Sequence, residues 1–192
     1  DGAEVRALSD LSTDRLAVAR GRHPRASLSR DYTELLTDPA VDAVAIATPV
    51  STHFDIALAA LRAGKHVLVE KPLASTSEHA LRLIDEADRR GLVLMVDHTF
   101  VYTGAVGTIR QLIRAGELGT IYYYDSVRIN LGLFQHDVNV LWDLAVHELS
   151  IMDYVLGCQP TTVSATGIAH VPGEPEKSLL IILKNQLEDA MR

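Results

Sequence analysis

Residues 41–74 read VDAVAIATPVSTHFDIALAALRAGKHVLVEKPLA, and the order of elements in this stretch indicates a layered α/β architecture. Ala43 to Ala47 is a continuous apolar run, which is typical of a strand buried on both faces. Ser51 is the predicted N-cap of a helix that ends at Gly64, and His66 to Val69 is the next buried strand. Strand, helix and strand at this spacing predict a parallel sheet with right-handed crossovers.

The segments on either side of this stretch continue the alternation of strands and helices. Ser12 and Asp31 are predicted N-caps of short helices, and Gly91 is the predicted end of a longer one. The further predicted elements are a strand over 3–8, helices over 13–20, 32–36 and 77–91, and a strand over 92–96. The first half of the chain is therefore predicted to be one α/β domain, residues 1–100.

Polar residues follow the predicted strands of this domain. In open parallel sheets, ligands bind beyond the carboxyl ends of the strands. We therefore expect the polar clusters at these ends to form one site. The clusters are Asp10, Thr48-Pro49, Glu70-Lys71 and Asp97-His98.

The second half of the chain has a different pattern, with few helices between its strands. Gly119 to Asn130 (GTIYYYDSVRIN) has the aromatic and β-branched content of a long strand. Two further strands are predicted over 161–171 and 178–184. Residues 101–192 are therefore predicted to form a second domain of the α+β class with a mainly antiparallel sheet.

A predicted helix in this second domain carries the first candidate catalytic residues. Residues 143–157 read DLAVHELSIMDYVLG, and helical spacing places Asp143, His147, Ser150 and Tyr154 on one face. Most of the remaining circumference is apolar, so the helix is expected to be buried, and its polar face needs partners or a ligand. His147 is a candidate general acid or base, with Asp143 orienting it or the substrate. The alternatives are a core histidine satisfied by the carboxylate, or a metal site, which would need a third ligand.

Lys71 is the second candidate, because it ends a predicted strand and Pro72 restricts it to extended geometry. A lysine held there can place its ammonium group on a substrate oxygen, whereas the alternative is a surface lysine beside a turn. Asp10 is either a ligand for a ribose or a turn cap, and His53 either a ligand contact or a residue of a first helical turn. Arg128 and Asn130, on one face of the long strand, either bind substrate or are solvated.

Composition limits the functional classes. The chain has 192 residues, 47% of them hydrophobic, and a formal charge of −7 without blocks of like charge, so no nucleic-acid or membrane partner is indicated. No apolar run approaches the roughly 20 residues that a membrane helix needs, and no signal peptide is visible. The single Cys158 fits a reducing compartment. These features predict a soluble cytoplasmic protein.

Two stretches, residues 41–74 and WDLAVHELSIMDYVLG at 142–157, resemble the Gfo/Idh/MocA family of NAD(P)-dependent sugar and cyclitol oxidoreductases. The resemblance implies a Rossmann-type parallel sheet followed by an α+β domain that serves substrate binding and oligomerisation, so a homo-oligomer is expected. The sequence contains no G-x-G-x-x-G and starts where the second strand of such a domain would start. Both domains are thus expected to be incomplete, and this chain alone is expected to bind cofactor poorly or not at all.

The resemblance also implies roles for individual residues. Lys71 would touch the substrate hydroxyl and the nicotinamide, His147 would accept a proton, and Asp143 would hold the substrate or the imidazole. Asp10 would bind the adenosine ribose and favour NAD over NADP. The implied cofactor-lining residues are Asp10, Thr48, Pro49, His53, Glu70 and Lys71. The implied substrate-binding residues are Lys71, Arg128, Asn130, Asp143 and His147, with no metal.

Residues 131–156 are similar to the nucleotide-sugar branch of the family, which includes UDP-N-acetylglucosamine 3-dehydrogenases. Val140, Leu141 and Trp142 stand where the family commonly has glycines. The expected activity is hydride transfer between NAD and a hydroxyl or keto carbon of a sugar, specifically a nucleotide sugar. The alternatives are a cyclitol dehydrogenase, a reductase of a 3-keto sugar, and a non-catalytic protein that binds a nucleotide or a sugar.

Overall fold

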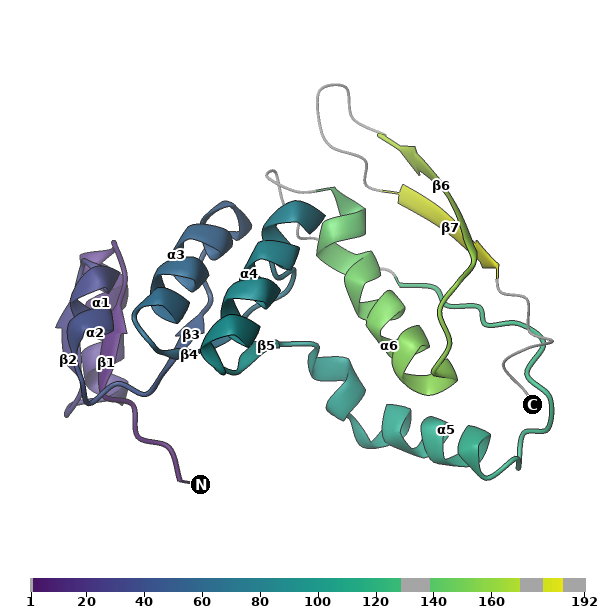
Figure 1. Cartoon of the computed structure of the whole chain (residues 1–192), viewed down its shortest axis with the longest axis horizontal. Coiled ribbons are helices and arrows are strands. Elements are labelled where there is room, and N and C mark those ends of the chain that lie inside the picture. Colours follow the sequence, from purple (N-terminus) through teal and green to yellow (C-terminus); the bar gives the residue numbers. More distant parts are fainter. Residues whose placement is uncertain (1, 129–138, 170–177, 185–192) are drawn as a thin grey trace. The chain divides into compact units, whose positions relative to one another are not determined.

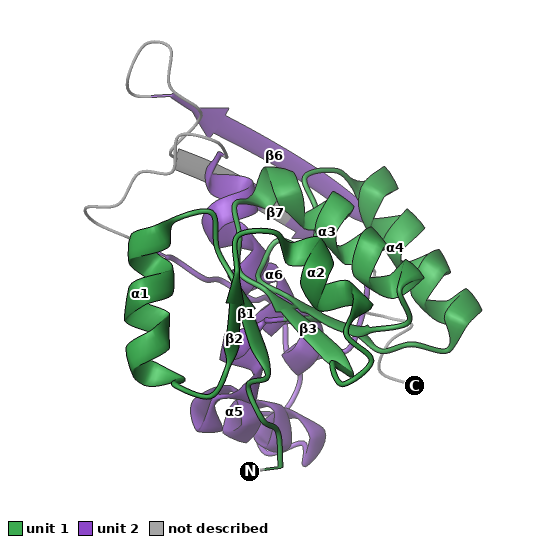
Figure 2. Ribbon diagram, turned by 90° about the vertical axis from the view of Figure 1, so that its left-hand side faces the viewer, with its two compact units in different colours: residues 1–96 green, residues 97–192 purple. Residues whose placement is uncertain are grey.

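A computed structural model describes residues 2–128, 139–169 and 178–184 (Figure 1). The chain divides into two compact units, residues 1–96 and 97–192 (Figure 2). The division therefore falls four residues before the domain boundary that the sequence predicts. Each unit is described by itself below.

Unit 1 consists of alternating short strands and helices. Every strand pair in it is parallel: β1 pairs with β2, and β4 lies between β3 and β5 in a second sheet. This topology confirms the predicted parallel α/β fold. The elements are β1 (Ala7–Ser9), α1 (Thr13–Arg22), β2 (Ser27–Ser29), α2 (Tyr32–Thr37), β3 (Ala43–Ile46), α3 (Val50–Arg62), β4 (His66–Val69), α4 (Ser77–Arg90) and β5 (Leu94–Val96).

Local sequence signals explain most helix ends in unit 1. The Ser12 side chain accepts a hydrogen bond from the Arg15 backbone N–H, and Asp31 accepts one from Thr33, as their predicted capping roles require. Gly91 ends α4 with a φ of 65°, a left-handed conformation that glycine adopts without a side-chain clash. These three predictions are confirmed.

The predicted N-cap at Ser51 is wrong, because α3 already begins at Val50 and Pro49 precedes it without a side-chain capping bond. The Thr52 hydroxyl hydrogen-bonds to the Pro49 carbonyl oxygen at 2.7 Å. The fixed φ of proline prepares the chain for a helical turn, and the helix starts two residues earlier than a cap at Ser51 would allow.

The core of unit 1 lies between the β3–β4–β5 sheet and the adjacent helices α3 and α4 (Figures 1 and 2). Ala57, Ala60 and Leu61 of α3 and Leu83 and Ala87 of α4 are buried against the sheet. The small alanines let the helices approach the strands closely. The strand residues that complete this core are Ile46, Val67 and Val69.

The opposite face of the same sheet is uncovered by the described residues. Ala45, Leu68 and Met95 are paired neighbours across β3, β4 and β5, so they form one row on this face. Leu68 is 37% exposed and Met95 38% exposed. The prediction that the Ala43–Ala47 strand is buried on both faces is therefore wrong, because α3 and α4 cover only one face.

Lys65 is a buried lysine, with 7% of its surface exposed, in the turn between α3 and β4. Its ammonium group donates hydrogen bonds to the backbone carbonyl oxygens of Asp38, at 2.8 Å, and Val41, at 2.7 Å. A buried cation needs such partners. Lys65 thus joins the loop before β3 to the turn before β4, the strand that leads to Glu70-Lys71.

We predict that Lys65→Met destabilises the protein by about 2–3 kcal/mol, because two buried carbonyl oxygens lose a charged donor. Urea unfolding followed by circular dichroism measures this loss. An unfolding free energy within about 0.5 kcal/mol of the original would contradict the bridging role.

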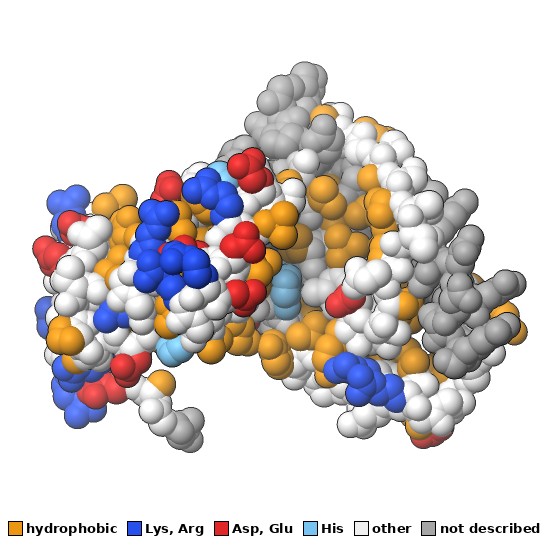
Figure 3. All heavy atoms as spheres, in the orientation of Figure 1, with side chains coloured by type: hydrophobic (Ala, Val, Ile, Leu, Met, Phe, Trp, Pro, Cys, Tyr) orange, Lys and Arg blue, Asp and Glu red, His pale blue; other side chains and the backbone are white. Residues whose placement is uncertain are grey.

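Glu86 is the centre of a charged cluster on α4. Its carboxylate hydrogen-bonds to Arg89 and to Arg90, and Arg62 of α3 lies 4.0 Å away. The hydrogen bonds from Arg89 and Arg90 lower the pKa of Glu86 to about 2. On the face that Figure 3 shows, basic side chains gather over α3 and α4 beside acidic ones.

A carboxylate with a lowered pKa stabilises the folded state fully above its unfolded pKa, which is 4.5 for Glu86. This stabilisation is lost as the pH falls from 4.5 towards 2. We therefore predict that Glu86→Gln flattens the dependence of stability on pH within this window, measured by urea unfolding. The control is Glu78→Gln in the exposed first turn of the same helix. Equal pH dependence in the two variants would contradict the prediction.

The described residues of unit 2 form helices followed by two strands. β6 and β7 pair in antiparallel register, as the sequence predicts for this domain. Among the described residues of the chain, no helix is long and apolar enough to cross a membrane. The elements are η1 (Thr99–Tyr102), α5 (Gly104–Arg114), η2 (Leu141–Ala145), α6 (Val146–Leu156), β6 (Thr162–Ile168) and β7 (Ser178–Lys184).

The long strand predicted over Gly119–Asn130 is not observed. Residues 119–128 form no strand, and no other described segment pairs with them. A strand needs a partner for its backbone hydrogen bonds, so aromatic and β-branched content does not suffice. Tyr122 is 79% exposed and Tyr123 84% exposed. Asn130 itself lies outside the described residues.

Candidate active site

The strands of the β3–β4–β5 sheet end in register. Ile46, Val69 and Val96 are paired across the three strands. The chain leaves β3 towards Thr48 and β4 towards Lys71 from the same row, so these two predicted site residues follow neighbouring strand ends. The Glu70 backbone N–H donates to the Ile46 carbonyl oxygen at 2.8 Å, which extends the pairing beyond the strand.

His53 joins the ends of these two strands from the first turns of α3. Its Nε2 atom lies 2.8 Å from the Thr48 carbonyl oxygen, and its Nδ1 atom lies 2.8 Å from the Pro72 carbonyl oxygen. His53 is only 1% exposed. The ring therefore braces the turn that carries Lys71, while the direct contact with a cofactor stays a prediction.

The residues that His53 braces are more accessible. Thr48 and Pro49 are exposed, and Glu70 and Lys71 are half-buried. The Thr48 hydroxyl is hydrogen-bonded to the Thr52 hydroxyl at 2.7 Å, and the Lys71–Pro72 peptide bond is cis. This edge of the sheet thus presents a hydroxyl, a carboxylate and an ammonium group.

Asp10 follows β1, which belongs to the other sheet of unit 1. Its Oδ1 atom accepts a hydrogen bond from the Ser12 backbone N–H at 2.8 Å, and its Oδ2 atom lies 3.2 Å from Arg15 Nε. The capping role is therefore observed. A carboxylate has about four acceptor positions, so Asp10 keeps acceptor capacity for a ribose diol, and that contact stays a prediction. The carboxylate and hydroxyl oxygens of Asp10, Thr48 and Glu70 are groups that can hydrogen-bond to sugar hydroxyls, and their contact with a cofactor stays a prediction.

In unit 2, Asp143 and His147 lie on consecutive turns of one helix whose first part differs from the prediction. Leu141–Ala145 forms a π-helical turn, and the α-helix begins at Val146. The sequence predicts a regular α-helix that places Asp143 and His147 on one face. That prediction is wrong for the first turn, because a π turn is wider than an α turn. Such turns occur frequently at functional sites.

Asn139 holds the start of this helix. Its side-chain oxygen accepts hydrogen bonds from the backbone N–H groups of Leu141, at 3.1 Å, and Trp142, at 3.4 Å. The Asn139 carbonyl oxygen also accepts a bond from the Asp143 N–H. These bonds satisfy donors that a helix start otherwise leaves without partners and fix the backbone of Asp143.

His147 is buried, with 9% of its surface exposed. Its surroundings include the predicted site residue Arg128 together with Phe100 and Glu148, which the sequence did not indicate. The Phe100 ring lies edge-on to the imidazole, with ring centroids 4.8 Å apart and an angle of 77° between the planes. The Arg128 guanidinium lies over the Phe100 ring, 4.2 Å from its centroid. Glu148, the next residue of the helix, pairs with Arg128 at 2.5 Å.

The other polar residues near these elements have internal roles. The Ser150 hydroxyl donates to the His147 carbonyl oxygen at 2.8 Å, and Arg110 of α5 lies over the Tyr154 ring, 3.9 Å from its centroid.

Burial lowers the pKa of His98, and the charge of the adjacent Asp97 partly opposes that shift. No group of His, Cys, Asp or Glu within the described part of the chain could hold a metal ion.

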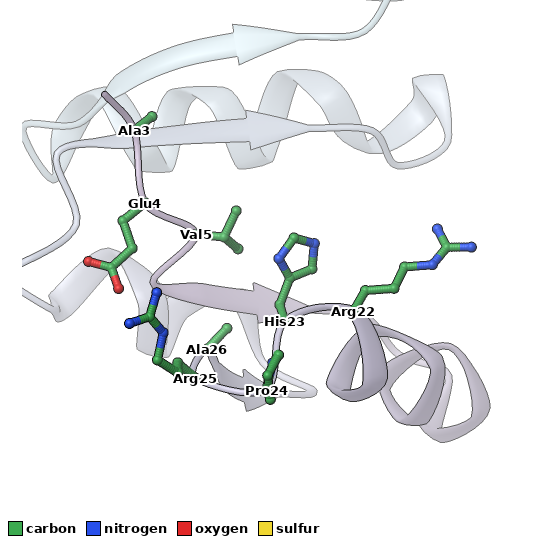
Figure 4. A pocket seen from close by; sticks show the side chains of 8 residues that line it. All are labelled: Ala3, Glu4, Val5, Arg22, His23, Pro24, Arg25 and Ala26. Atoms are coloured by element: carbon green, nitrogen blue, oxygen red, sulfur yellow. The ribbon is translucent and has the colours of Figure 1, made fainter. Parts of the chain in front are cut away.

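A cavity of about 480 Å³ lies at the other end of unit 1 (Figure 4). Its lining segments precede β1 and β2, so it opens at the amino ends of these strands. That end is opposite to the carboxyl end where Asp10 lies, and the cavity is not the predicted site. Its lining residues are Ala3, Glu4, Val5, Arg22, His23, Pro24, Arg25 and Ala26.

Comparison with known proteins identifies the class to which this fold and these residues belong. Residues 1–98 match an oxidoreductase family described by its NAD-binding Rossmann fold, and residues 106–191 match the GFO/IDH/MocA C-terminal domain. The chain belongs to the Gfo/Idh/MocA family of oxidoreductases.

Three similar proteins illustrate the range of the family. A scyllo-inositol 2-dehydrogenase (NAD(+)) from Bacillus subtilis is 33% identical over 72% of this chain and 42% of its own length. A UDP-N-acetylglucosamine 3-dehydrogenase from Acidithiobacillus ferrooxidans is 38% identical over 68% of this chain and 41% of its own. The crystal structure of GenD2 from gentamicin A biosynthesis in complex with NAD has a TM-score of 0.81 and 26% identity, covering 94% of this chain and 54% of that protein. The chain spans about half the length of the curated relatives it matches.

Proposed function

We propose that the intact protein carrying this chain transfers a hydride between a nicotinamide cofactor and a hydroxyl or keto carbon of a sugar. The observation that carries the proposal is the position of Lys71, which follows β4 at the carboxyl edge of a parallel sheet in a chain of an oxidoreductase family. Ligands of such sheets bind at this edge. His53 restrains the adjoining Pro72, so the lysine stands on a braced turn.

The bound cofactor supplies the acceptor or donor of the hydride. The residues of this chain bind the substrate and handle its proton. In the oxidation direction the Lys71 ammonium donates a hydrogen bond to the substrate oxygen and stabilises the negative charge that develops there. His147 accepts the hydroxyl proton as a general base, and Asp143 holds the substrate or the imidazole. Lys71 and His147 belong to different units, so their action on one substrate is part of the proposal.

The proposed substrate is a nucleotide sugar. This choice is supported by the similarity of residues 131–156 to the nucleotide-sugar branch and by the 38% identity to a UDP-N-acetylglucosamine 3-dehydrogenase. A cyclitol is the second candidate, because a relative of comparable identity is named a scyllo-inositol dehydrogenase. Substrate contacts of Arg128 and Asn130 are part of the proposal.

The proposed cofactor is NAD. Relatives in the family include an enzyme named for NADP(+), so membership alone does not select the cofactor, and the choice depends on Asp10. Its carboxylate accepts hydrogen bonds from a ribose diol and repels a 2′-phosphate. Arg15 beside it offsets part of that repulsion, so the expected discrimination is a preference for NAD and not an exclusion of NADP.

The test is a steady-state assay of the intact protein with UDP-N-acetylglucosamine, scyllo-inositol and a buffer blank, each with NAD and with NADP. We expect absorbance of reduced nicotinamide to rise fastest with the nucleotide sugar and NAD. A higher kcat/KM for scyllo-inositol than for the nucleotide sugar would show that the substrate is a cyclitol and contradict the proposed substrate. Tight cofactor binding without turnover of either substrate would favour a non-catalytic binding protein.

We also propose that the intact protein is a homo-oligomer. Support comes from β6, whose seven residues are all exposed within the described part of the chain, including Val163 and Ile168. Uncovered apolar side chains on a sheet favour association. Light scattering of the intact protein decides this, and the mass of a monomer at micromolar concentration would contradict it.

A further inference from the structure

We propose that Phe100 is the positioning residue of His147 and that Arg128, held by Glu148, keeps Phe100 in place. The inference deepens the proposed function, because it concerns how the proton acceptor is oriented. All four residues belong to unit 2.

A helix does not by itself fix the plane of a histidine ring, because the second side-chain torsion of histidine is broad. The imidazole of His147 therefore needs a neighbour that defines its plane. Phe100 is such a neighbour: its ring meets the imidazole edge-on at 4.8 Å and 77°, which is the favoured geometry of an aromatic pair. Phe100 comes from η1, so the contact joins two separate elements.

Phe100 in turn is held on its face by a cation. The Arg128 guanidinium lies 4.2 Å from the ring centroid, well within the distance of a cation–π contact. The guanidinium also pairs with Glu148 at 2.5 Å, and Ser126 hydrogen-bonds to the same carboxylate. The side chains of Arg128 and Glu148 are partly buried, 25% and 20% exposed, and their ion pair restrains both.

These contacts form a closed circuit. Glu148 follows His147 directly on α6 and pairs with Arg128. Arg128 in turn lies over the Phe100 ring, and Phe100 contacts the His147 ring edge-on. Each side chain is thus restrained from two sides, and the circuit returns to the helix from which it starts. Such mutual restraint is what a proton acceptor requires, because a misplacement of about 1 Å can cost a hundredfold in rate.

The chain offers a matched control in unit 1. Phe54 also lies between a histidine and an arginine: it stacks on His79, with centroids 3.9 Å apart, and Arg82 lies 4.9 Å from its ring centroid. Phe54→Leu therefore removes a ring with the same kinds of neighbours in the other unit of the chain. Effects of lost aromatic packing in general should appear in both variants.

The experiment compares Phe100→Leu, Phe100→Tyr and Phe54→Leu in the intact protein by histidine NMR and by steady-state kinetics. We expect Phe100→Leu to shift the imidazole C–H resonances of His147, to lower kcat by about tenfold and to change KM little. Phe100→Tyr keeps the ring and should restore most of both. Phe54→Leu should leave the His147 resonances and kcat unchanged.

The proposal is overturned if Phe100→Leu leaves the His147 resonances in place, if kcat does not fall, or if Phe54→Leu has the same effects. Should Phe100→Leu fail to fold, Arg128→Met answers the question, because it releases Phe100 without removing the ring and should shift the same resonances. The NMR comparison needs no turnover. An intact protein without dehydrogenase activity would therefore refute the proposed function, while the resonances still decide whether Phe100 orients His147.

Discussion

Replacing His147 by alanine in the intact protein is expected to lower kcat by about a hundredfold or more, because positioned general bases contribute about 10²–10⁴-fold. KM should change much less, since the imidazole acts on a proton that moves only in the reaction. His147 is buried at the start of α6, and helix-start contacts of Asn139 hold the preceding turn. The backbone that carries His147 is therefore held by contacts within the chain itself.

The pH dependence of kcat gives the prediction a second readout. A histidine accepts a proton only in its neutral form, so the rate of the unchanged enzyme should fall as the pH is lowered. This acidic decline should disappear in His147→Ala. The control is His79→Ala, which removes another histidine that packs against a phenylalanine. An unchanged kcat in His147→Ala would remove this residue from the role of general base.

The predictable parts of the fold are those with local causes. The helix caps at Ser12 and Asp31 and the helix end at Gly91 depend on residues within a few positions, and each is observed. Apolar runs indicated β3 and β4 for the same reason. A parallel order followed from the alternation of strands with helices.

The sequence did not predict correctly the segments whose structure depends on distant partners. β2 (Ser27–Ser29) has the polar sequence SLS and is a strand because it pairs with β1. The tyrosine-rich segment 119–128 shows the converse, since it has strand-like residues but no described partner. The uncovered face of Leu68 and Met95 follows from where the helices pack, which an apolar run cannot reveal.

The candidate site divides in the same way. The position of Lys71 at the carboxyl edge of the sheet was predictable, because the topology follows from the alternation of strands and helices, and ligands of parallel sheets bind at this edge. The contacts of Arg128 with Phe100 and Glu148 were not, since each joins residues twenty or more positions apart. The π turn at Asp143 also lacks a sequence signal that distinguishes it from an ordinary helical turn.

Lys71→Met should lower kcat by about 100- to 1,000-fold while leaving the free energy of unfolding nearly unchanged. The rate effect has the size expected for removing one donor that stabilises developing negative charge on oxygen. The stability should survive, because the turn is held through the Pro72 carbonyl oxygen and His53, and not only through the lysine side chain. Lys71→Arg should recover part of the lost kcat, because the guanidinium keeps the positive charge. The recovery should be incomplete, because the planar guanidinium lacks the compact shape of an ammonium group.

Lys65 provides the matched comparison, because it lies six residues earlier and its ammonium group binds two backbone carbonyl oxygens in the interior. Lys65→Met should therefore reduce the free energy of unfolding without reducing the kcat of the folded enzyme. Lys71→Met should reduce kcat without reducing the free energy of unfolding. Urea unfolding and steady-state kinetics on both variants separate the two roles. If Lys71→Met lost stability as Lys65→Met does and kept its kcat, Lys71 would be a structural lysine, and the hydride-transfer proposal would lose its main support.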